Sequence, residues 1–301
     1  MTRVMRLDRF LTLAVFQPLR RAGPGEGEPR LPILMYHSIS DGREERKSAY
    51  YQTATHPKVF ADQMAMLRAE GYQAVTLTAG LETLQSWMTN GKGNFPRCVA
   101  VTFDDGFRDF YTVAFPILQQ HEFAATMFLP TSYIGQQARR FKSRECLTWS
   151  EVKELHRVGM EFGSHTVTHP RLVELDWPDI EKEMNDSKAQ IDDHLGVPAK
   201  AFAYPYAFPE ANQDFVQHFR QLLGKAGYRS SVTTKIGRAH PGDDRLCLKR
   251  LPVNSGDDTP LFRAKLHGAY DWLSWPQAFS KTARHLVERG RKDPALLSAV
   301  E

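Results

Sequence analysis

The sequence predicts an α/β protein built on a mostly parallel β-sheet. From about residue 32 to residue 275, short apolar segments alternate with helical segments, which is the order typical of βα units. The chain of 301 residues is within reach of one α/β domain, and it shows no internal repeat. We therefore expect one domain over 32–275, preceded by a basic segment and linker over 1–31 and followed by a peripheral helical tail over 276–301.

The expected strands are short apolar runs. The clearest is CVAVTF, residues 98–103, a continuous β-branched run typical of a strand buried on both faces. The full set of expected strands is 33–39, 73–77, 98–103, 125–130, 160–166, 201–206 and 229–234.

The expected helices are marked by apolar spacing and by their end residues. Residues 148–159 begin with Thr148 or Ser150 as a cap, carry glutamates in the first turn and end at Gly159. Residues 176–196 begin at an aspartate and also end at a glycine. The full set is 56–72, 112–120, 148–159, 176–196 and 213–228.

Composition excludes several classes of protein. A hydrophobic content of 42% and a charged content of 25% are ordinary for a globular protein. The net charge of +4 comes without any nucleic-acid-binding signature, so no nucleic acid partner is expected. The three cysteines are widely spaced, which argues against a disulfide framework and favours a reducing compartment.

The first 31 residues are basic and end in a linker rich in glycine and proline. The apolar run 10–16 is too short to span a bilayer and lacks the cleavage site of a secretory signal. Two alternatives stay open for this segment: peripheral contact with anionic lipid, or packing on the domain. We expect a cytoplasmic or peripheral inner-membrane protein, with the periplasm as the alternative location.

Three expected strands end in residues that can carry chemistry. Strand 98–103 runs into Asp104-Asp105, strand 160–166 into a segment with His165 and His169, and strand 201–206 ends in Tyr204-Pro205-Tyr206. Taken singly, these ends also fit an Asx-turn that caps a helix, a pair of loop histidines and a rigid aromatic turn. Functional residues gather at the carboxyl ends of strands in α/β proteins, so we expect the three ends to meet.

Together the three strand ends fit one hydrolytic mechanism. Two imidazoles and one carboxylate suit a divalent metal with open positions, and the second aspartate is then free to act as a base. The metal would polarise a carbonyl and lower the pKa of a bound water. A backbone N–H in a tight turn, such as that of Tyr206, could stabilise the oxyanion.

At this point the sequence resembles the polysaccharide deacetylases, the NodB-homology or carbohydrate esterase family 4 group. The similarity runs from about Pro32 to Trp275 and depends on TFDDG and SHTVTH, which match the first two family motifs in order. The resemblance implies a distorted (β/α) barrel of seven to eight mostly parallel strands. It also implies a metal held by Asp105, His165 and His169, with Asp104 as general base.

The implied reaction is hydrolysis of an N-acetyl group on an N-acetylhexosamine-containing glycan, either a polysaccharide or a lipid-linked saccharide. The partner is then the N-acetylated glycan, and the implied cofactor is a divalent metal, zinc before cobalt, nickel or iron. The sequence does not specify the oligomeric state. Two competing functions are a hydrolase of other linear or cyclic amides on the same fold and a glycan-binding domain with an impaired site.

The third family motif is incomplete here. Many members have an arginine that braces the catalytic aspartate, but Ala203 occupies that position in FAYPYA. Pro205 and Tyr206 remain, so the oxyanion role of Tyr206 and substrate contacts by both residues carry over from the resemblance. We expect Arg250, in LKRLPV, to replace the missing arginine and to lie at the substrate site.

The last family motif, a leucine followed two residues later by an acid histidine, is also absent. His267 directly follows Leu266, so its spacing is wrong. A circularly permuted subset, which acts on exopolysaccharides of the poly-N-acetylglucosamine type, instead carries Met-Tyr-His after an early apolar strand. ILMYHSI resembles that pattern, so we predict His37 as general acid and the first strand beside the last.

The basic run at residues 139–144 is the remaining charged feature. Such a run is typical of a solvated loop. Contact with an anionic glycan is the alternative.

Overall fold

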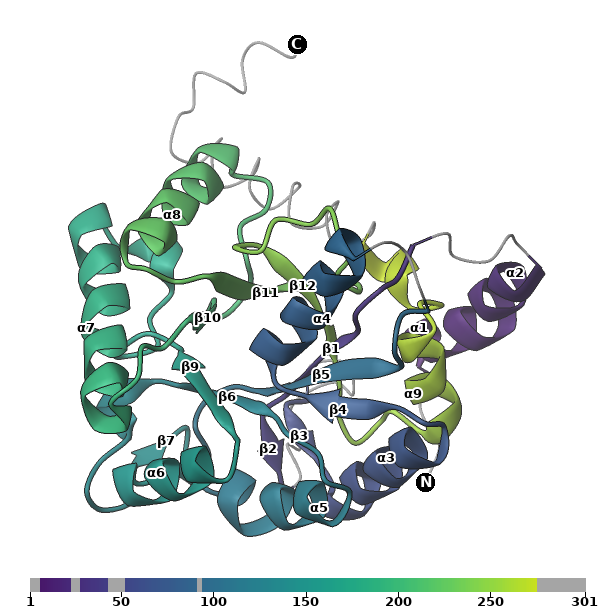
Figure 1. The fold of residues 1–301 in the computed structure, drawn as a ribbon, viewed down its shortest axis with the longest axis horizontal. Coiled ribbons are helices and arrows are strands. Elements are labelled where there is room, and N and C mark those ends of the chain that lie inside the picture. Colours follow the sequence, from purple (N-terminus) through teal and green to yellow (C-terminus); the bar gives the residue numbers. More distant parts are fainter. Residues whose placement is uncertain (1–5, 23–27, 43–51, 91–93, 275–301) are drawn as a thin grey trace.

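The computed structural model describes residues 6–22, 28–42, 52–90 and 94–274. The tail predicted over 276–301 lies outside the described residues. Within the described part, twelve strands and nine α-helices alternate along most of the chain (Figure 1).

Seven parallel strands close into a barrel. β1 pairs with β12 on one side and with β5 on the other, which joins the two ends of the sheet into a ring. In ring order the strands are β1 (Ile33–Tyr36), β12 (Leu248–Pro252), β11 (Ser230–Ile236), β10 (Ala201–Ala203), β9 (Glu161–Ser164), β6 (Thr126–Leu129) and β5 (Cys98–Phe103). The predicted fold class is therefore confirmed, and the first strand does lie beside the last.

The short strand β4 (Gln73–Val75) supplements the ring. It pairs with the first half of β5, from Cys98 to Ala100, whereas β6 pairs with Thr102 and Phe103 in the second half. All six side chains of β5 are buried, as the apolar run predicted. β5 is thus the strand with the most neighbours, and it leads directly into Asp104.

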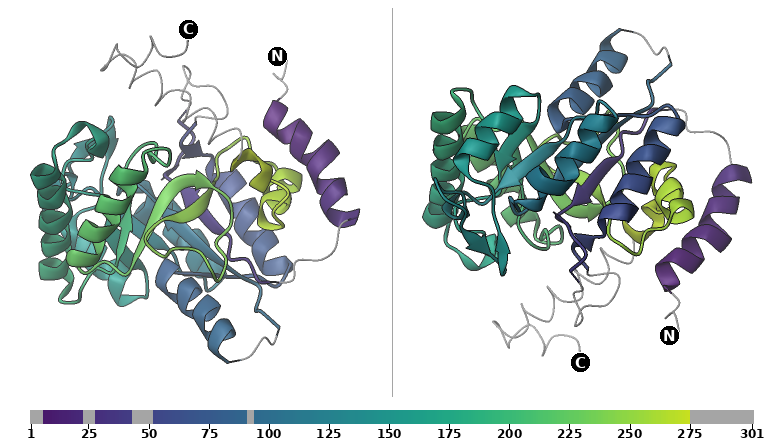
Figure 2. Two further views of the ribbon diagram at one scale, coloured as in Figure 1. Left: turned by 90° about the horizontal axis from the view of Figure 1, so that it is seen from above. Right: turned by 90° about the horizontal axis from the view of Figure 1, so that it is seen from below.

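Helices lie outside the strands on both sides of the ring (Figures 1 and 2). Each predicted helical segment contains a helix, and α6 begins at Thr148 with a full capping box. The larger helices are α3 (Pro57–Ala69), α4 (Leu77–Thr89), α5 (Phe115–Gln120), α6 (Trp149–Arg157), α7 (Trp177–Leu195), α8 (Gln213–Lys225) and α9 (Thr259–Leu266).

Two small β elements stand apart from the barrel. β2 (Ser38–Ile39) pairs with β3 (Ala54–Thr55), so the strand predicted over 33–39 is divided at His37 into β1 and β2. β7 (Arg140–Phe141) and β8 (Arg144–Glu145) form an antiparallel hairpin, where the sequence had predicted a solvated loop.

The N-terminal segment is helical and docked on the domain. α1 (Leu7–Leu11), a π-helical turn η1 (Thr12–Phe16) and α2 (Gln17–Ala22) run without a break beside α9. Phe16 stacks on Trp272 at a ring distance of 4.7 Å, and the Trp272 indole N–H donates to Thr12. Packing on the domain is therefore observed for this segment.

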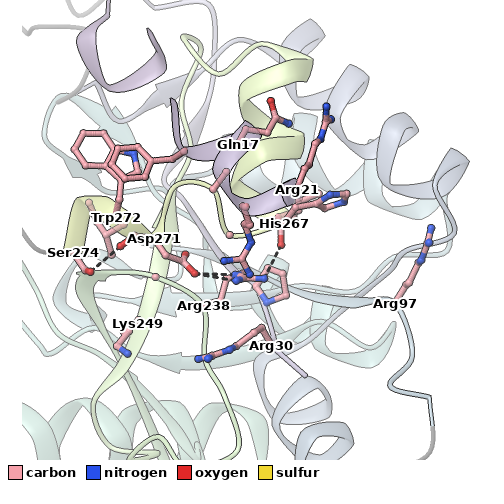
Figure 3. Close-up of a pocket in the computed structure, with 18 of the residues that line it drawn as sticks. Gln17, Arg21, Arg30, Arg97, Arg238, Lys249, His267, Asp271, Trp272 and Ser274 are labelled. Atoms are coloured by element: carbon pink, nitrogen blue, oxygen red, sulfur yellow. Dashed lines mark hydrogen bonds and ion pairs between the residues drawn. The ribbon is translucent and has the colours of Figure 1, made fainter. Parts of the chain in front are cut away.

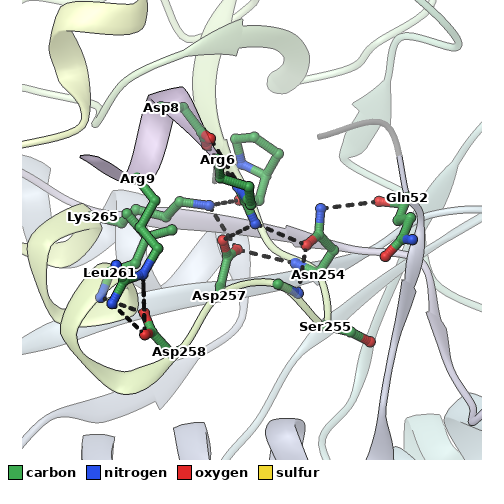
Figure 4. A network of polar contacts seen from close by, with 12 residues as sticks. Arg6, Asp8, Arg9, Gln52, Asn254, Ser255, Asp257, Asp258, Leu261 and Lys265 are labelled. Carbon is green, nitrogen blue, oxygen red and sulfur yellow. Dashed lines mark hydrogen bonds and ion pairs between the residues drawn. The ribbon is translucent and has the colours of Figure 1, made fainter. Parts of the chain in front are cut away.

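A polar network fixes the start of this helix (Figure 4). Arg6 Nη1 lies 3.2 Å from Asp257 Oδ1, and Arg9 Nη2 lies 2.7 Å from Asp258 Oδ2. The buried Lys265 of α9 also contacts Asp257, at 2.7 Å. The acidic pair that follows β12 thus links the N-terminal helix to α9. No helix in the described ranges has the length and apolar character needed to cross a bilayer.

Candidate active site

A cavity of about 1100 Å³ opens at the carboxyl ends of the barrel strands. His37 follows β1, Asp104 follows β5, His165 and His169 follow β9, and Tyr206 follows β10; all five line this one cavity. Residues far apart in the sequence are brought together because parallel strands end at the same rim of the barrel.

Asp105, His165 and His169 form the possible metal centre. Their ligand atoms lie within 4.8 Å of one another, and all three residues are buried. His169 Nε2 is 3.2 Å from Asp105 Oδ1, and His165 Nε2 is 3.8 Å from the same oxygen. One carboxylate and two imidazoles in this arrangement fit a divalent cation that keeps open positions for water and substrate.

Hydrogen bonding prepares His165 as a ligand. Its Nδ1 lies 2.8 Å from the Ala203 carbonyl oxygen, which can only accept, so Nδ1 carries the proton and the lone pair of Nε2 is left for a cation between His165 and Asp105. Burial lowers the pKa of His165 to about 3, which keeps the imidazole neutral.

The histidine loop is held in a strained conformation. Thr166 and His169 have φ angles of 69° and 57°, in the left-handed region that residues other than glycine rarely adopt. Glu183 of α7 accepts hydrogen bonds from the backbone N–H groups of Val167 and Thr168, at 2.7 and 2.9 Å. This carboxylate offsets the strain and places both histidines toward Asp105, a role that the sequence motif alone did not reveal.

The Asp104-Asp105 turn also uses the left-handed region. Asp105 has φ 74° and Gly106 has φ 64°. A Cβ at position 106 would lie 3.0 Å from the Ile134 side chain, so glycine suits both the backbone and the space. The turn sends the two neighbouring carboxylates to different partners.

Asp104 is paired with Arg250 of β12. The guanidinium approaches both carboxylate oxygens, with Nη1 to Oδ1 at 2.7 Å and Nη2 to Oδ2 at 2.8 Å. Burial disfavours the charged carboxylate, but Arg250 outweighs it and holds the pKa of Asp104 below its ordinary value. Arg250 is itself only 1% exposed and also donates to the Thr233 carbonyl at 3.0 Å.

Arg250 therefore occupies the position of a brace behind the aspartate. Neither Arg250 nor the buried Pro205 is among the residues that line the cavity. The geometry gives no support to the substrate contacts predicted for these two residues.

His37 lies close to Asp104. Its Nε2 is 3.9 Å from Asp104 Oδ2, and its side chain is 19% exposed in the cavity. Burial lowers the pKa of His37, despite the opposing charges of both aspartates. The imidazole is therefore neutral in the resting protein. His267, at the end of α9, lines a different cavity.

Tyr206 is the exposed wall of the site. Its ring packs edge-on against His169 at 4.7 Å, and the side chain is 44% exposed. Its backbone has φ 60°, and no described residue accepts a hydrogen bond from its N–H. This amide is available to a ligand in the cavity.

Lys142, at the tip of the β7–β8 hairpin, enters the site unexpectedly. Its Nζ lies 3.2 and 3.1 Å from the two oxygens of Asp105, and it lines the cavity. Arg144 of the same hairpin donates to Ser38 and Ser40. The interpretation of this basic run as a solvated loop is wrong for these two residues, because the hairpin folds back over the cavity.

Comparison with known proteins supports the resemblance to the polysaccharide deacetylases. The polysaccharide deacetylase family model matches residues 92–230. YxkH of Bacillus subtilis (strain 168), which is assigned to the polysaccharide deacetylases, is 32% identical over 239 residues, covering 79% of this chain and 77% of that protein. Poly-beta-1,6-N-acetyl-D-glucosamine N-deacetylase of Staphylococcus aureus is 30% identical over 173 residues, covering 54% of this chain and 57% of that protein.

Solved structures share the fold. Streptococcus pyogenes deacetylase PplD, determined in complex with acetate, superposes with a TM-score of 0.66 at 30% identity, covering 79% of this chain and 99% of that chain. IcaB from Ammonifex degensii superposes with a TM-score of 0.65 at 23% identity, covering 81% of this chain and all of that chain, which shows a common fold. The barrel, the cavity and the extended similarity to YxkH lead to one conclusion: the chain belongs to the polysaccharide deacetylase family, with a NodB-type barrel.

Proposed function

We propose that this protein is a metal-dependent N-deacetylase that hydrolyses the N-acetyl groups of an N-acetylglucosamine-containing glycan. The observation that carries the proposal is the cavity that joins the Asp105, His165 and His169 cluster to Asp104 and His37. The similarity to a poly-β-1,6-N-acetylglucosamine deacetylase supports this substrate class, as does the similarity to a deacetylase with bound acetate.

The metal would be held by Asp105, His165 and His169. Two imidazoles and a carboxylate favour zinc, with cobalt, nickel and iron as alternatives of similar ligand preference. When bound, a divalent cation supplies Lewis-acid chemistry, polarising the acetyl carbonyl and lowering the pKa of the attacking water.

Asp104 would act as the base. It stays ionised because Arg250 holds its pKa low, and its position on the cavity wall lets it take a proton from water as the water oxygen attacks the acetyl carbon. The backbone N–H of Tyr206 would donate a hydrogen bond to the oxygen that becomes negatively charged. The pairing with Arg250 also fixes the orientation of the Asp104 carboxylate.

His37 would act as the acid. The C–N bond breaks as the sugar nitrogen receives a proton, which leaves a free amine and acetate. Because the imidazole is neutral at rest, the proton must reach His37 during the reaction, and Asp104 is 3.9 Å away. We propose that the proton taken up by Asp104 reaches the leaving nitrogen through His37.

Acetate release from β-1,6-linked N-acetylglucosamine oligomers tests the proposal. The metal-free protein should be inactive and should recover activity with zinc, cobalt or nickel. Asp105→Asn and His165→Ala should lose both activity and bound metal. Persisting activity in either variant would overturn the metal assignment. Hydrolysis of small linear or cyclic amides in place of the oligomers would overturn the substrate class.

A further inference from the structure

A second cavity lies at the other end of the barrel. It encloses about 950 Å³ and is lined by Pro32, just before β1, and by Cys98, the first residue of β5 (Figure 3). The active-site residues follow the last residues of the same two strands. Along β5, the two cavities lie one strand length apart, roughly 20 Å at 3.3 Å per residue.

This second cavity is strongly basic. Six cationic side chains line it, whereas Asp271 is the single carboxylate among its described lining residues. The cations come from α2, from the segment before β1, from the segment before β5 and from the β11–β12 region: Arg20, Arg21, Arg30, Arg97, Arg238 and Lys249.

The single carboxylate is already engaged. Asp271 Oδ2 accepts hydrogen bonds from Arg238 Nε and Nη2, at 3.1 and 3.0 Å. Burial and the neighbouring charge of Arg238 lower the pKa of Arg20, with a smaller effect of Arg30 and an opposing one of Asp271, so several guanidinium groups lie close enough in the cavity to repel one another. An anion in the cavity would offset this repulsion.

The helix beside the cavity has an exposed apolar face. Four of the nine exposed large apolar side chains in the described residues lie on this one helix: Leu7, Phe10, Val15 and Leu19. Leu7 and Leu19 are 64% and 62% exposed, and Leu19 also lines the basic cavity. The apolar face therefore meets the mouth of the basic cavity at Leu19, next to Arg20 and Arg21 of α2.

The helix is held in place by contacts on its other side, so its apolar face cannot turn inward against the domain. The opposite side of the helix already packs through Thr12 and Phe16 against Trp272, and Arg6 and Arg9 hold its first turn. The helix lies at the edge of the molecule (Figure 2), and its exposed apolar side chains are free to contact a partner.

We propose that helix 7–22 and the basic cavity form a docking surface for a membrane containing anionic phospholipid. Leu7, Phe10, Val15 and Leu19 enter the interfacial region of the lipid, and the cavity arginines bind the lipid phosphates. Apolar side chains beside arginines on one helix are the pattern of interfacial helices, and each basic residue near an anionic surface adds to binding. A soluble phosphate ligand would not account for the apolar face. The inference does not depend on the proposed function.

Sedimentation with vesicles tests the proposal on the full-length protein. Vesicles of phosphatidylcholine are compared with vesicles that contain phosphatidylglycerol in addition, at low and high salt. Binding to the anionic vesicles, weakened by salt, is expected because exposed charges are screened. Equal binding to both kinds of vesicle, or to neither, would overturn the proposal.

Paired variants localise the surface. Leu19→Gln and Arg21→Glu should each weaken anionic vesicle binding, the charge reversal by roughly tenfold or more. Met88→Gln and Arg157→Glu make the same changes at exposed positions elsewhere and should leave binding unchanged. Equal losses in test and control variants would contradict the assigned surface.

Two further measurements separate other occupants. Thermal stabilisation by inorganic phosphate without any vesicle binding would replace the lipid with a soluble anion. Dimerisation that Leu19→Gln abolishes, again without vesicle binding, would assign the face to a second copy of the chain. Activity of Leu19→Gln on soluble oligomers should equal that of the unaltered protein, which keeps this test separate from that of the proposed reaction.

Discussion

The pair formed by Asp104 and Arg250 joins two strands that neighbour β1 on opposite sides. An arginine on β12 takes the place that the family motif gives to a residue beside Tyr204, where this chain has Ala203. The charge is thus supplied from a different strand but reaches the same carboxylate. A planar guanidinium that contacts both oxygens fixes the orientation of Asp104 as well as its charge.

Arg250→Lys should shift the pH dependence of activity. The lysine cannot make the bidentate contact, so the pKa of Asp104 should rise, and the base should become protonated at a higher pH than in the unaltered protein. The acid limb of the kcat/KM profile is therefore expected to move to higher pH. An unchanged profile with full activity would exclude the bracing role.

Arg250→Ala should cost stability as well as activity. Removing one partner leaves the Asp104 carboxylate buried without its cation, a change that typically costs about 3–5 kcal/mol. Urea unfolding of the metal-free variant measures this. A loss below about 1 kcal/mol would indicate that Asp104 is more hydrated than its 2% exposure implies.

His37→Ala separates proton donation from metal binding. His37 lies 3.9 Å from Asp104 and is not a member of the Asp105, His165 and His169 cluster. Turnover should fall by roughly 10²-fold or more, the usual contribution of general acid catalysis, whereas bound metal should stay the same. Loss of metal in this variant would make His37 a ligand.

At the residue scale, the sequence predicted the site residues that directly follow strands. It did not predict the residues of other elements that contact the site. Asp104, Asp105, His165 and His169 could be predicted because motif and strand end coincide. Lys142 and Glu183 could not, since their contacts depend on how a hairpin and a long helix pack over the rim. No spacing along the chain encodes those distances.

At the element scale, the β7–β8 hairpin brings a basic run to the Asp105, His165 and His169 cluster. Lys142 Nζ, at the tip of the hairpin, contacts both carboxylate oxygens of Asp105. The same ammonium lies 4.6 Å from the centre of the Phe141 ring. A cation bound by Asp105 would have to compete with this ammonium or displace it.

Lys142→Met should therefore strengthen metal binding. Without the lysine charge, no ammonium competes with the metal for the Asp105 carboxylate. Zinc affinity, measured in competition with a chelator, should therefore rise several-fold. Arg157→Met, a similar loss of charge outside the cavity, is the control. Weaker zinc binding in Lys142→Met would show that the lysine organises the site rather than competing for it.

Helices with clear apolar periodicity or capping residues were predicted from the sequence, whereas less regular elements were not. α6 and α7 carry capping residues and glycine stops that the structure confirms. α4, β12 and α9 were not predicted from the sequence. β12 mixes buried and partly exposed side chains and includes a buried arginine, so it lacks the continuous apolar run of β5.

At the scale of the whole molecule, the metal-free protein should lose stability as the pH falls. The pKa of His165 is about 3 in the folded protein, against an ordinary value of 6.5, so between these values the unfolded chain binds the extra proton. Stability should therefore decline as the pH drops below 6.5, with a slope of up to about 1.4 kcal/mol per pH unit for one proton.

Urea unfolding at several pH values in the presence of a chelator checks this decline. The lowered pKa of Asp105 adds a loss only near and below its ordinary value of 3.8, so Asp105 does not contribute to the decline between pH 6.5 and pH 4.5. His165→Asn should make the decline in that window shallower. An equally steep decline in this variant would assign the proton to another group.

The alternation of strands and helices predicted a parallel α/β sheet, but it did not predict that the sheet closes into a barrel. Parallel strands and helices can form either an open sheet or a ring. Only the pairing of β1 with both β5 and β12 decides between them. The β1–β12 pairing joins residues more than two hundred positions apart. The resemblance to a known family, not the periodicity, predicted that the first strand lies beside the last.

The placement of the two cavities at opposite ends of β5 has a consequence for the substrate. With lipid at the Cys98 end, the catalytic opening would face the aqueous phase at a standoff of roughly 20 Å from the bilayer. Sugars joined directly to a membrane carrier would lie too close to the bilayer to contact Asp104 and His37. The enzyme would then modify a polymer only after several units had extended past the headgroups, leaving the membrane-proximal units acetylated.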